Sequence, residues 1–177
     1  MTPFFIYFNL PWKNVFIPYK QNNILSSYFH IMKTIVITSG YFNPIHPWHI
    51  ECMELCKELW DELRVIVNND NQARLKTWKT EVFQDENFRD RVVSALKVVD
   101  ETMISVDQDG SVCESIREIA KRIRDKHWDD TKIIFGKWWD RFSWNIPEVQ
   151  VCEELDIEIR DWLWAKTHNS SDYRNRV

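Results

Sequence analysis

Residues 34–49 read TIVITSGYFNPIHPWH. The apolar, β-branched run 34–39 predicts a short buried strand, Gly40–Pro44 a turn, and a helix is expected from about Pro47 to Leu59, with proline in its first turn. Such a helix start presents unpaired backbone N–H groups and a partial positive charge, which suit a phosphate. His46 and His49 lie three residues apart in this turn, so both rings can direct N–H donors at one anionic group.

Strands and helices alternate along the rest of the chain. Further strands are expected at 63–68, 102–106, 132–135 and 157–159, and further helices at 85–98, 112–125 and 147–155, whereas 69–81 reads as a polar segment. This alternation predicts an α/β fold, a five-stranded parallel sheet with helices on both faces. Ligands of such sheets bind at the carboxyl ends of the strands, near the point where the strand order reverses.

Composition narrows the class of protein. The 177 residues are 44% hydrophobic and 28% charged, which predicts one globular, soluble domain. A net charge of −4 argues against a protein that binds nucleic acid through its phosphates, and no apolar stretch is long enough to span a membrane. The four cysteines form no CxxC pair, so they are interpreted as reduced core thiols of a cytoplasmic protein rather than as a metal site.

The chain is expected to have two segments. Residues 1–31 alternate between aromatic and polar residues without the compact apolar centre of a secretory signal, and Met32 stands directly before the first strand of the domain. Residues 1–31 are therefore expected to be an N-terminal extension, either poorly ordered or an artefact of a start codon chosen too early. Residues 32–177 are expected to form the functional domain.

The turn and helix start resemble the nucleotide-binding signature of the cytidylyltransferase-like superfamily, Gly-x-Phe-Asp-x-x-His-x-Gly-His. The matching residues are Gly40, Phe42, His46 and His49. The departures are Asn43, in place of the usual Asp, and Trp48, in place of the usual Gly. The resemblance covers roughly residues 32–174, with further matches at 59–61, 68–70, 89, 137–141, 143–145 and 169–171. It implies a Rossmann-like, doubly wound parallel sheet.

The resemblance also implies a nucleotidyltransferase, which moves CMP or AMP from CTP or ATP to a small phosphorylated acceptor and releases pyrophosphate. The implied catalytic residues are His46, His49 and Lys79. The implied nucleotide-binding residues are Gly40, Tyr41, Phe42, Asn43, Trp48, Lys76, Arg89, Asp140, Arg141, Ser170 and Ser171. Mg²⁺ is expected with the triphosphate, bridging its oxygens with few protein ligands, and no residue is assigned to a metal.

This reaction asks the protein mainly to position its substrates and neutralise phosphate charge. The resemblance implies that His46 and His49 hold α- and β-phosphate oxygens, with Lys76 or Lys79 on the same oxygens and the choice between the two lysines open. The resemblance further implies that Ser170 and Ser171 contact the γ-phosphate. It implies that Asp140 and Arg141 lie by the nucleotide sugar or base. For Arg89, the alternative to a nucleotide contact is a surface ion pair.

The balance of glycine and tryptophan is unusual, with 3 Gly and 10 Trp. Trp48 stands at a family glycine, Trp60 stands where a helix C-cap favours glycine, and Trp138 and Trp139 share a polar turn. We hypothesise that codons meant as glycine are read here as tryptophan, the alternative being a truly Trp-rich protein. An indole at position 48 would fill part of the nucleotide site. The literal chain is therefore expected to be inactive or unstable, and the glycine-restored chain active.

Two other functions stay open, and both require genuine tryptophans: a non-catalytic nucleotide-binding relative, and an interaction protein with an exposed aromatic surface. For the enzyme, glycerol phosphate is the default acceptor, with an amino-alcohol phosphate, a sugar phosphate and flavin mononucleotide as alternatives. The choice between CTP and ATP is open. Relatives are often dimers, so a homodimer is one expected assembly, whereas neither a nucleic acid nor a membrane is an expected partner.

Overall fold

The computed structural model describes residues 4–10, 13–19, 33–77, 82–127, 131–137 and 146–161. The chain divides into two compact units, Met1–Ile31 and Met32–Val177. The first contains the antiparallel pair β1 (Phe4–Leu10) and β2 (Lys13–Tyr19), in which Phe4 pairs with Tyr19 and Leu10 with Lys13. That residues 1–31 are dispensable for function stays a prediction, which deletion to Met32 tests.

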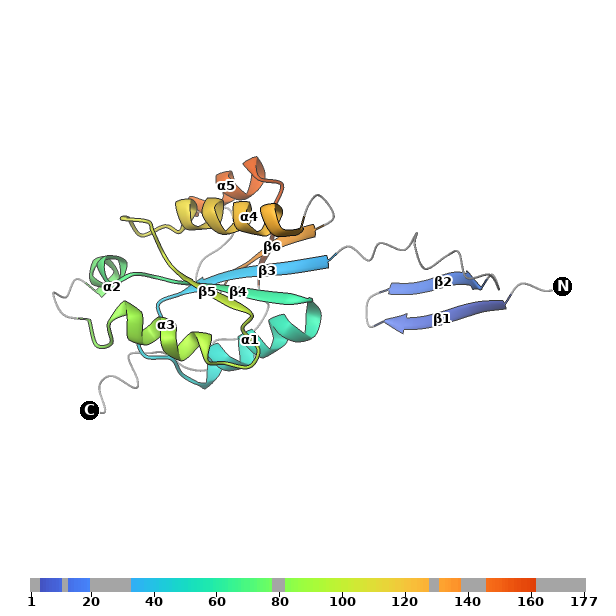
Figure 1. The fold of residues 1–177 in the computed structure, drawn as a ribbon, viewed down its shortest axis with the longest axis horizontal. Coiled ribbons are helices and arrows are strands. Elements are labelled where there is room, and N and C mark those ends of the chain that lie inside the picture. The colour runs from blue at the N-terminus through green and yellow to red at the C-terminus, as the bar shows by residue number, and fades with distance from the viewer. Residues whose placement is uncertain are drawn as a thin grey trace. The chain divides into compact units, whose positions relative to one another are not determined.

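Five parallel strands form the sheet of the second unit (Figure 1). In chain order they are β3 (Lys33–Gly40), β4 (Glu62–Val67), β5 (Glu101–Ile104), β6 (Thr131–Lys137) and β7 (Glu158–Asp161). Across the sheet the order is β5-β4-β3-β6-β7, with every neighbouring pair parallel. The chain runs outward from β3 to β5 and then crosses to β6, so the strand order reverses between β3 and β6. This is the doubly wound α/β fold that the sequence predicts.

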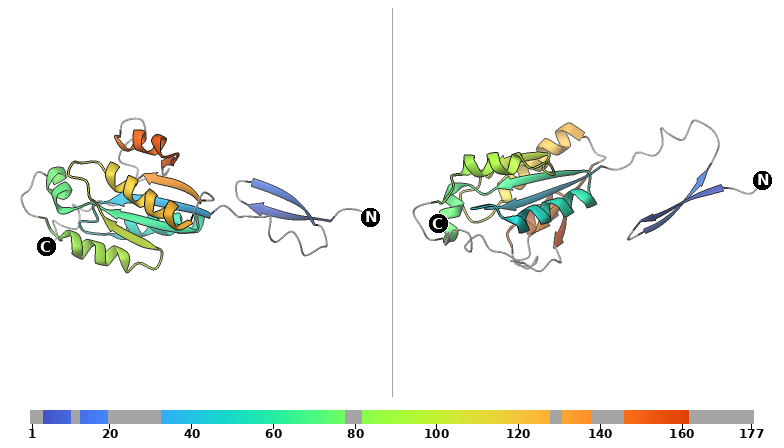
Figure 2. Two further views of the ribbon diagram at one scale, coloured as in Figure 1. Left: turned by 45° about the horizontal axis from the view of Figure 1, so that its top comes forward. Right: turned by 90° about the horizontal axis from the view of Figure 1, so that it is seen from below.

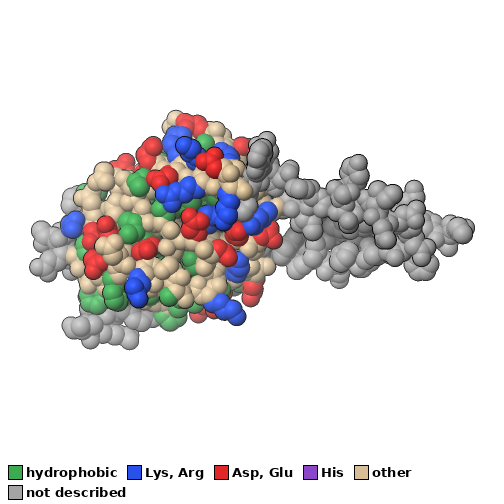
Figure 3. All heavy atoms as spheres, in the orientation of Figure 1, with side chains coloured by type: hydrophobic (Ala, Val, Ile, Leu, Met, Phe, Trp, Pro, Cys, Tyr) green, Lys and Arg blue, Asp and Glu red, His purple; other side chains and the backbone are tan. Residues whose placement is uncertain are grey.

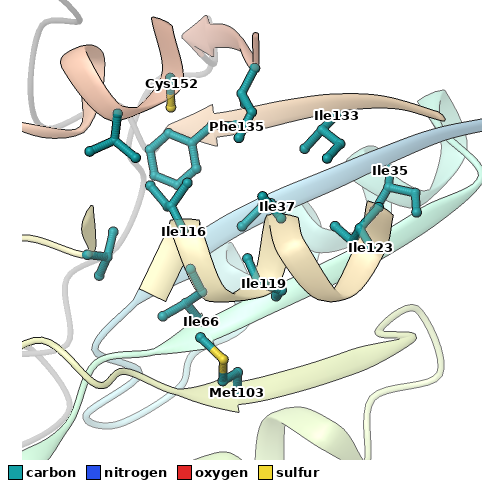
Figure 4. Packing of buried hydrophobic residues seen from close by; sticks show 14 residues of the cluster. Ile35, Ile37, Ile66, Met103, Ile116, Ile119, Ile123, Ile133, Phe135 and Cys152 are labelled. Atoms are coloured by element: carbon teal, nitrogen blue, oxygen red, sulfur yellow. The ribbon is translucent and has the colours of Figure 1, made fainter. Parts of the chain in front are cut away.

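Helices cover both faces of the sheet (Figure 2). On one face, α4 (Cys113–His127) and α5 (Glu148–Glu154) cover a cluster of buried residues. Along α4, Ile116 lies beside Phe135 and Ile123 lies beside Ile35 (Figure 4). On the other face, α1 (Pro47–Leu59) and α3 (Glu86–Ser94) cover a second cluster. Because β3 and β4 contribute side chains to both clusters, they are buried on both sides.

One helix was missed by the sequence prediction. The segment expected to be polar and irregular contains α2 (Asp70–Thr77). Its start is a reciprocal capping arrangement, in which Gln72 N donates to Asn69 Oδ1 at 2.9 Å and Asn69 N donates to Gln72 Oε1 at 3.1 Å. The pattern Asn-x-x-Gln was a readable signal for a helix start. The segment was read as irregular because it has almost no apolar residues to show a helical period.

Two helix ends differ from expectation. Helix α1 has the bounds that the sequence predicts, but its C-cap residue Trp60 has φ −142° and ψ 164°. That is extended backbone, which any residue adopts, so the inference that position 60 favours glycine is wrong for this conformation. Helix α3 is shorter than the predicted 85–98, because it ends at Ser94 and turns through Leu96, whose N–H donates to Val93 O at 3.1 Å.

Acidic and basic side chains are interspersed over the surface shown in Figure 3. Several of them form ion pairs between elements, such as Lys132–Glu158 between β6 and β7 and Arg117–Glu154 between α4 and α5. Such exposed pairs add little stability each. Among the helices of the described residues, none combines the length and the apolar character that crossing a membrane would take.

Candidate functional site

The turn after β3 is built on a close contact between Gly40 and Phe42. Phe42 has φ 47°, in the left-handed region, and its side chain is 1% exposed. A Cβ at Gly40 would lie 2.6 Å from Phe42 Cζ and 2.9 Å from Cε1, which is closer than atoms pack. Position 40 therefore has to be glycine for the Phe42 ring to fold back under the turn. The turn itself lies at the carboxyl end of the central strand, beside the reversal of strand order.

The two histidines of the signature stack against each other at the start of α1. His46 is the N-cap residue, and its N–H donates to Nδ1 of His49 at 3.2 Å. The N–H of His49 in turn donates to His46 O at 2.9 Å. The ring centroids are 3.8 Å apart with 30° between the planes. The backbone of the helix start thus places both imidazoles side by side at the end of the sheet where ligands bind.

The hydrogen bond to His49 also settles which of its nitrogens carries the proton. Because Nδ1 accepts from the His46 N–H, a neutral His49 ring carries its hydrogen on Nε2. The ring edge of Phe42 stands against the His49 ring at 5.1 Å between centroids and 71° between planes. The orientation of His49 is therefore set by two groups, and its N–H donor is Nε2.

Trp48 occupies the position where the signature has glycine. Its side chain is buried, at 6% exposed. The indole lies 6.2 Å from the His46 ring, nearly parallel to it at 28°, and 5.9 Å from the His49 ring. The indole therefore takes up space directly beside the two imidazoles, as expected for a large residue at this position.

Asn43, the other departure from the signature, is buried and serves a structural contact. Its Oδ1 accepts a hydrogen bond from the N–H of Gln84 at 3.1 Å. This bond ties the turn to the segment that leads into α3. An amide oxygen makes the contact as well as a carboxylate would, so the change from Asp to Asn leaves it intact.

Tyr41 and Lys76 bring α2 to the same turn. Lys76 Nζ lies 4.3 Å from the centroid of the Tyr41 ring, within the range of a cation–π interaction. Lys76 is exposed and sits in the last turn of α2. A cation that sequence analysis placed in an irregular segment is therefore carried by a helix and held over the turn that leads to the histidines.

Arg89 is a buried residue rather than a surface ion pair. Its side chain is fully covered, and its guanidinium makes four hydrogen bonds to protein groups. Their acceptors are Tyr41 O at 2.7 Å, Asn68 O at 2.5 Å, Asp70 Oδ1 at 2.6 Å and Gln84 O at 2.9 Å. The surface interpretation of Arg89 is thus wrong, because its partners come from the ends of β3 and β4, which only the fold brings together.

A second polar network joins the end of β5 to the start of α4. The carboxylate of Asp107 accepts from Glu114 N at 2.8 Å and Ser115 N at 2.9 Å, and buried Glu148 accepts from Val112 N at 3.0 Å. Two carboxylates therefore occupy this helix start. Sequence reasoning gave Asp107 and Glu148 no role, although an acidic residue shortly before an amphipathic helix is a recognisable capping signal.

Three of the four cysteines are core residues, as the sequence predicts, whereas Cys113 is only half-buried. Cys52, Cys56 and Cys152 are buried free thiols. Burial raises the pKa of each of these thiols to about 12, with smaller contributions from nearby negative groups. Thiols of this kind are poor nucleophiles and poor metal ligands at neutral pH.

Five of the residues assigned from sequence lie outside the described residues: Lys79, Asp140, Arg141, Ser170 and Ser171. Trp138 and Trp139 lie outside them as well. Within the part of the chain that the structure describes, no three His, Cys, Asp or Glu side chains gather as ligands for a metal ion. The described site therefore consists of the Gly40–Asn43 turn, the histidine pair, Trp48 and Lys76, with Arg89 behind them.

Comparison with known proteins places the chain in a family. The family model described as Cytidylyltransferase-like matches residues 37–174, which include the turn and both histidines. A FAD synthase from Archaeoglobus profundus is 37% identical over 102 residues, covering 55% of this chain and 63% of the relative. A FAD synthase from Thermoplasma acidophilum is 36% identical over 100 residues, covering 55% and 69%. The match thus spans roughly two thirds of these relatives.

Two further similarities are more distant. The bifunctional protein HldE from Histophilus somni is 35% identical over 75 residues, which are 42% of this chain and 16% of that protein. The crystal structure of the lipopolysaccharide core biosynthesis protein from Thermoplasma volcanium superposes on this chain with a TM-score of 0.56 and 23% sequence identity. The superposition covers 75% of this chain and 98% of that protein. At that identity the superposition shows a shared fold.

Proposed function

Because the chain belongs to the cytidylyltransferase-like family, we propose that it is a nucleotidyltransferase that joins a nucleoside monophosphate to a small phosphorylated acceptor. The donor is ATP or CTP, and pyrophosphate is released. The observation that carries the proposal is the stacked pair His46–His49 at the carboxyl end of β3, with 3.8 Å between ring centroids. Two ring donors, a helix start and the reversal of strand order coincide there.

In the proposed reaction, an oxygen of the acceptor attacks the α-phosphorus of the triphosphate. A new phosphorus–oxygen bond forms as the bond from the α-phosphorus to the bridging oxygen breaks, and that oxygen leaves with pyrophosphate. Negative charge builds on the non-bridging and leaving oxygens during this step. His49 Nε2–H and the His46 ring are proposed to donate hydrogen bonds to these oxygens and so to stabilise the transition state.

Lys76 is proposed as a further cation on the phosphates. It sits on α2 above the Tyr41 ring, 4.3 Å from its centroid, and a lysine side chain is long enough to move from the ring to a bound phosphate. The proposed roles of Lys79, Asp140, Arg141, Ser170 and Ser171, at the phosphates and at the sugar or base, follow from the family resemblance.

Mg²⁺ is proposed to accompany the triphosphate. The donor set of the described site is two imidazoles, a lysine and backbone groups, which suits phosphate oxygens better than a hard cation. Mg²⁺ would therefore be held mainly by the phosphates, where its charge offsets the charge of the leaving pyrophosphate. No residue is proposed as a ligand for it.

The proposed donor and acceptor follow the named relatives. Since two of the similar proteins are called FAD synthase, ATP with flavin mononucleotide is the first pair to test. CTP with glycerol phosphate, the default acceptor from sequence, is the second pair. Amino-alcohol and sugar phosphates complete the acceptor panel, and a homodimer in the cytoplasm is the proposed state of the enzyme.

The test is a pyrophosphate-release assay with ATP and CTP against this panel. Two chains are assayed: the printed sequence, and the same sequence with glycine at the tryptophan positions. Acceptor-dependent release by either chain supports the proposal. If neither chain releases pyrophosphate and neither binds a nucleoside triphosphate in a titration, the proposal is wrong.

A non-catalytic nucleotide-binding protein is the second candidate, and the observation in its favour is the buried indole of Trp48 beside both histidines. It predicts that the printed chain binds a triphosphate without releasing pyrophosphate. It also requires that the gene carry an unambiguous tryptophan codon at position 48. A glycine-restored chain that turns over substrate, from a gene with the ambiguous codon, would exclude this candidate.

A further inference from the structure

Helix α2 is held at its first turn by α3. Arg89 donates from Nη2 to Asp70 Oδ1 at 2.6 Å, and Glu86 Oε2 accepts from the N–H of Asp70 at 2.8 Å. Arg89 thus contacts the side chain of Asp70, the first residue of α2, and Glu86 contacts the backbone of the same residue. Helix α2 and the start of α3 lie near the end of the sheet where β3 and β4 stop (Figure 1).

The same guanidinium also holds the turn after β3. Nη1 of Arg89 donates to Tyr41 O at 2.7 Å and to Asn68 O at 2.5 Å. Tyr41 stands directly between Gly40 and the left-handed Phe42, so this carbonyl belongs to the turn itself. A single planar group therefore joins the end of β3, the end of β4 and the start of α2.

We propose that Arg89 is a positioning residue, which fixes α2, and with it Lys76, against the turn that carries Tyr41 and the two histidines. The inference deepens the proposed function and rests on it for its activity measurements. Arg89 has no exposed side-chain surface for a ligand. Its influence on a phosphate in the site therefore passes through Tyr41 and Lys76.

Lysine at position 89 is the informative substitution. It keeps the positive charge but replaces a planar fork with a single ammonium group, which cannot reach acceptors on four separate positions at once. Arg89→Lys is expected to lower kcat/KM for the nucleotide about 10- to 100-fold, because small displacements of catalytic groups have costs of this size. Arg91→Lys, an exposed change on the same helix, is the matched control and should leave kcat/KM unchanged.

A double-mutant cycle tests whether Arg89 acts through Lys76. Lys76→Met, Arg89→Lys and the double variant are compared in whichever chain releases pyrophosphate. If Arg89 positions Lys76, kcat/KM of the double variant is little lower than kcat/KM of the less active single variant, because both substitutions remove the same interaction. If the losses multiply, Arg89 does not act through Lys76 and the inference is wrong. Absence of release by every parent chain would instead count against the proposed function.

Amide hydrogen exchange in the nucleotide-free chain gives a readout that does not need activity. Arg89→Lys is expected to speed exchange in both 41–46 and 70–76, while α4 stays unchanged. Unchanged exchange in both segments would overturn the inference. Should Arg89→Lys fail to fold, Asp70→Ala removes one acceptor and keeps the guanidinium. Asp70→Ala is expected to speed exchange in 70–76. Its effect on kcat/KM is also expected to be coupled to that of Lys76→Met, and independent effects of the two substitutions would overturn the inference.

Discussion

The ring of Phe42 lies in the space that a side chain at Gly40 would need, because a Cβ there would come within 2.6 Å of Phe42 Cζ. The same ring stands edge-on to His49 with 5.1 Å between centroids. The glycine at position 40 thus determines where the side chain of Phe42, two residues later, can lie. It makes room for the ring that orients one of the two proposed catalytic imidazoles.

Gly40→Ala is therefore expected to lower both stability and activity. Overpacking of this kind costs about 1–3 kcal/mol, and displacement of Phe42 should disturb His49 and lower kcat. Urea unfolding and pyrophosphate release measure the two effects. Gly110→Ala is the control, since nothing lies within 4 Å of a Cβ there. Equal stability and kcat in the two variants would contradict this account of the turn.

His49 variants distinguish the two nitrogens of the ring. His49→Asn leaves an amide near the position of Nδ1 but no donor near Nε2, and it is expected to lower kcat about 100- to 1000-fold. His49→Gln places an amide N–H nearer the Nε2 position and should retain more activity. Glu54→Gln, an exposed change on α1, serves as the control. A His49→Asn variant more active than His49→Gln would mean that Nε2 is not the donor.

Lys76→Met is expected to raise KM for the nucleotide about 10- to 100-fold, the range for loss of a charged hydrogen bond to phosphate. Tyr41→Leu removes the ring beneath the ammonium and should raise KM by a smaller factor. Steady-state kinetics at varied nucleotide measure both. The comparison variant is Arg74→Gln, which removes an exposed charge from the same helix. Equal effects at positions 74 and 76 would indicate general electrostatic attraction rather than a specific contact.

Glu62 predicts a pH dependence of stability. Burial acts to raise the pKa of its carboxyl, but hydrogen bonds and charges from Lys33 and Arg64 outweigh it and bring the pKa below its usual 4.5. A lowered pKa means that the stabilisation is present above pH 4.5 and is lost as pH falls through the folded-state pKa. Glu62→Gln should therefore destabilise by about 1 kcal/mol at pH 7, screening included.

The difference in the free energy of unfolding between Glu62→Gln and the parent chain should shrink as the pH falls below 4.5. Denaturant unfolding across this pH range measures it, with Glu58→Gln, an exposed change on α1, as the control. A difference that stays constant with pH would show that the carboxylate charge is not the source of the stabilisation.

Trp48→Gly, together with glycine at the other tryptophan positions, is expected to convert an inactive chain into an active one. The physical reason is the space that the indole takes beside both imidazoles, 6.2 Å and 5.9 Å from their centroids. Pyrophosphate release by the printed and restored chains measures the change. Full activity of the chain with tryptophan would contradict the prediction. An unambiguous tryptophan codon at position 48 would contradict the separate hypothesis that a glycine codon has been misread.

Sequence by itself determined the elements whose causes are local. The apolar β-branched run of β3, the proline in the first turn of α1 and the alternation of strands with helices predicted the sheet, and the structure confirms that fold. The histidine spacing predicted for the same reason that His46 and His49 lie side by side, since residues three apart at a helix start are neighbours in any fold. The capping pair Asn69–Gln72 was equally local and was overlooked.

Tertiary structure alone decided the role of Arg89 and the conformation of Trp60. The Arg89 partners include Tyr41, 48 positions away along the chain, and Asn68, 21 positions away. Their carbonyls converge only because β3 and β4 pair in parallel and end together. Trp60 takes an extended conformation because the chain passes directly into β4, so its backbone angles follow from the next strand rather than from a helix-capping rule.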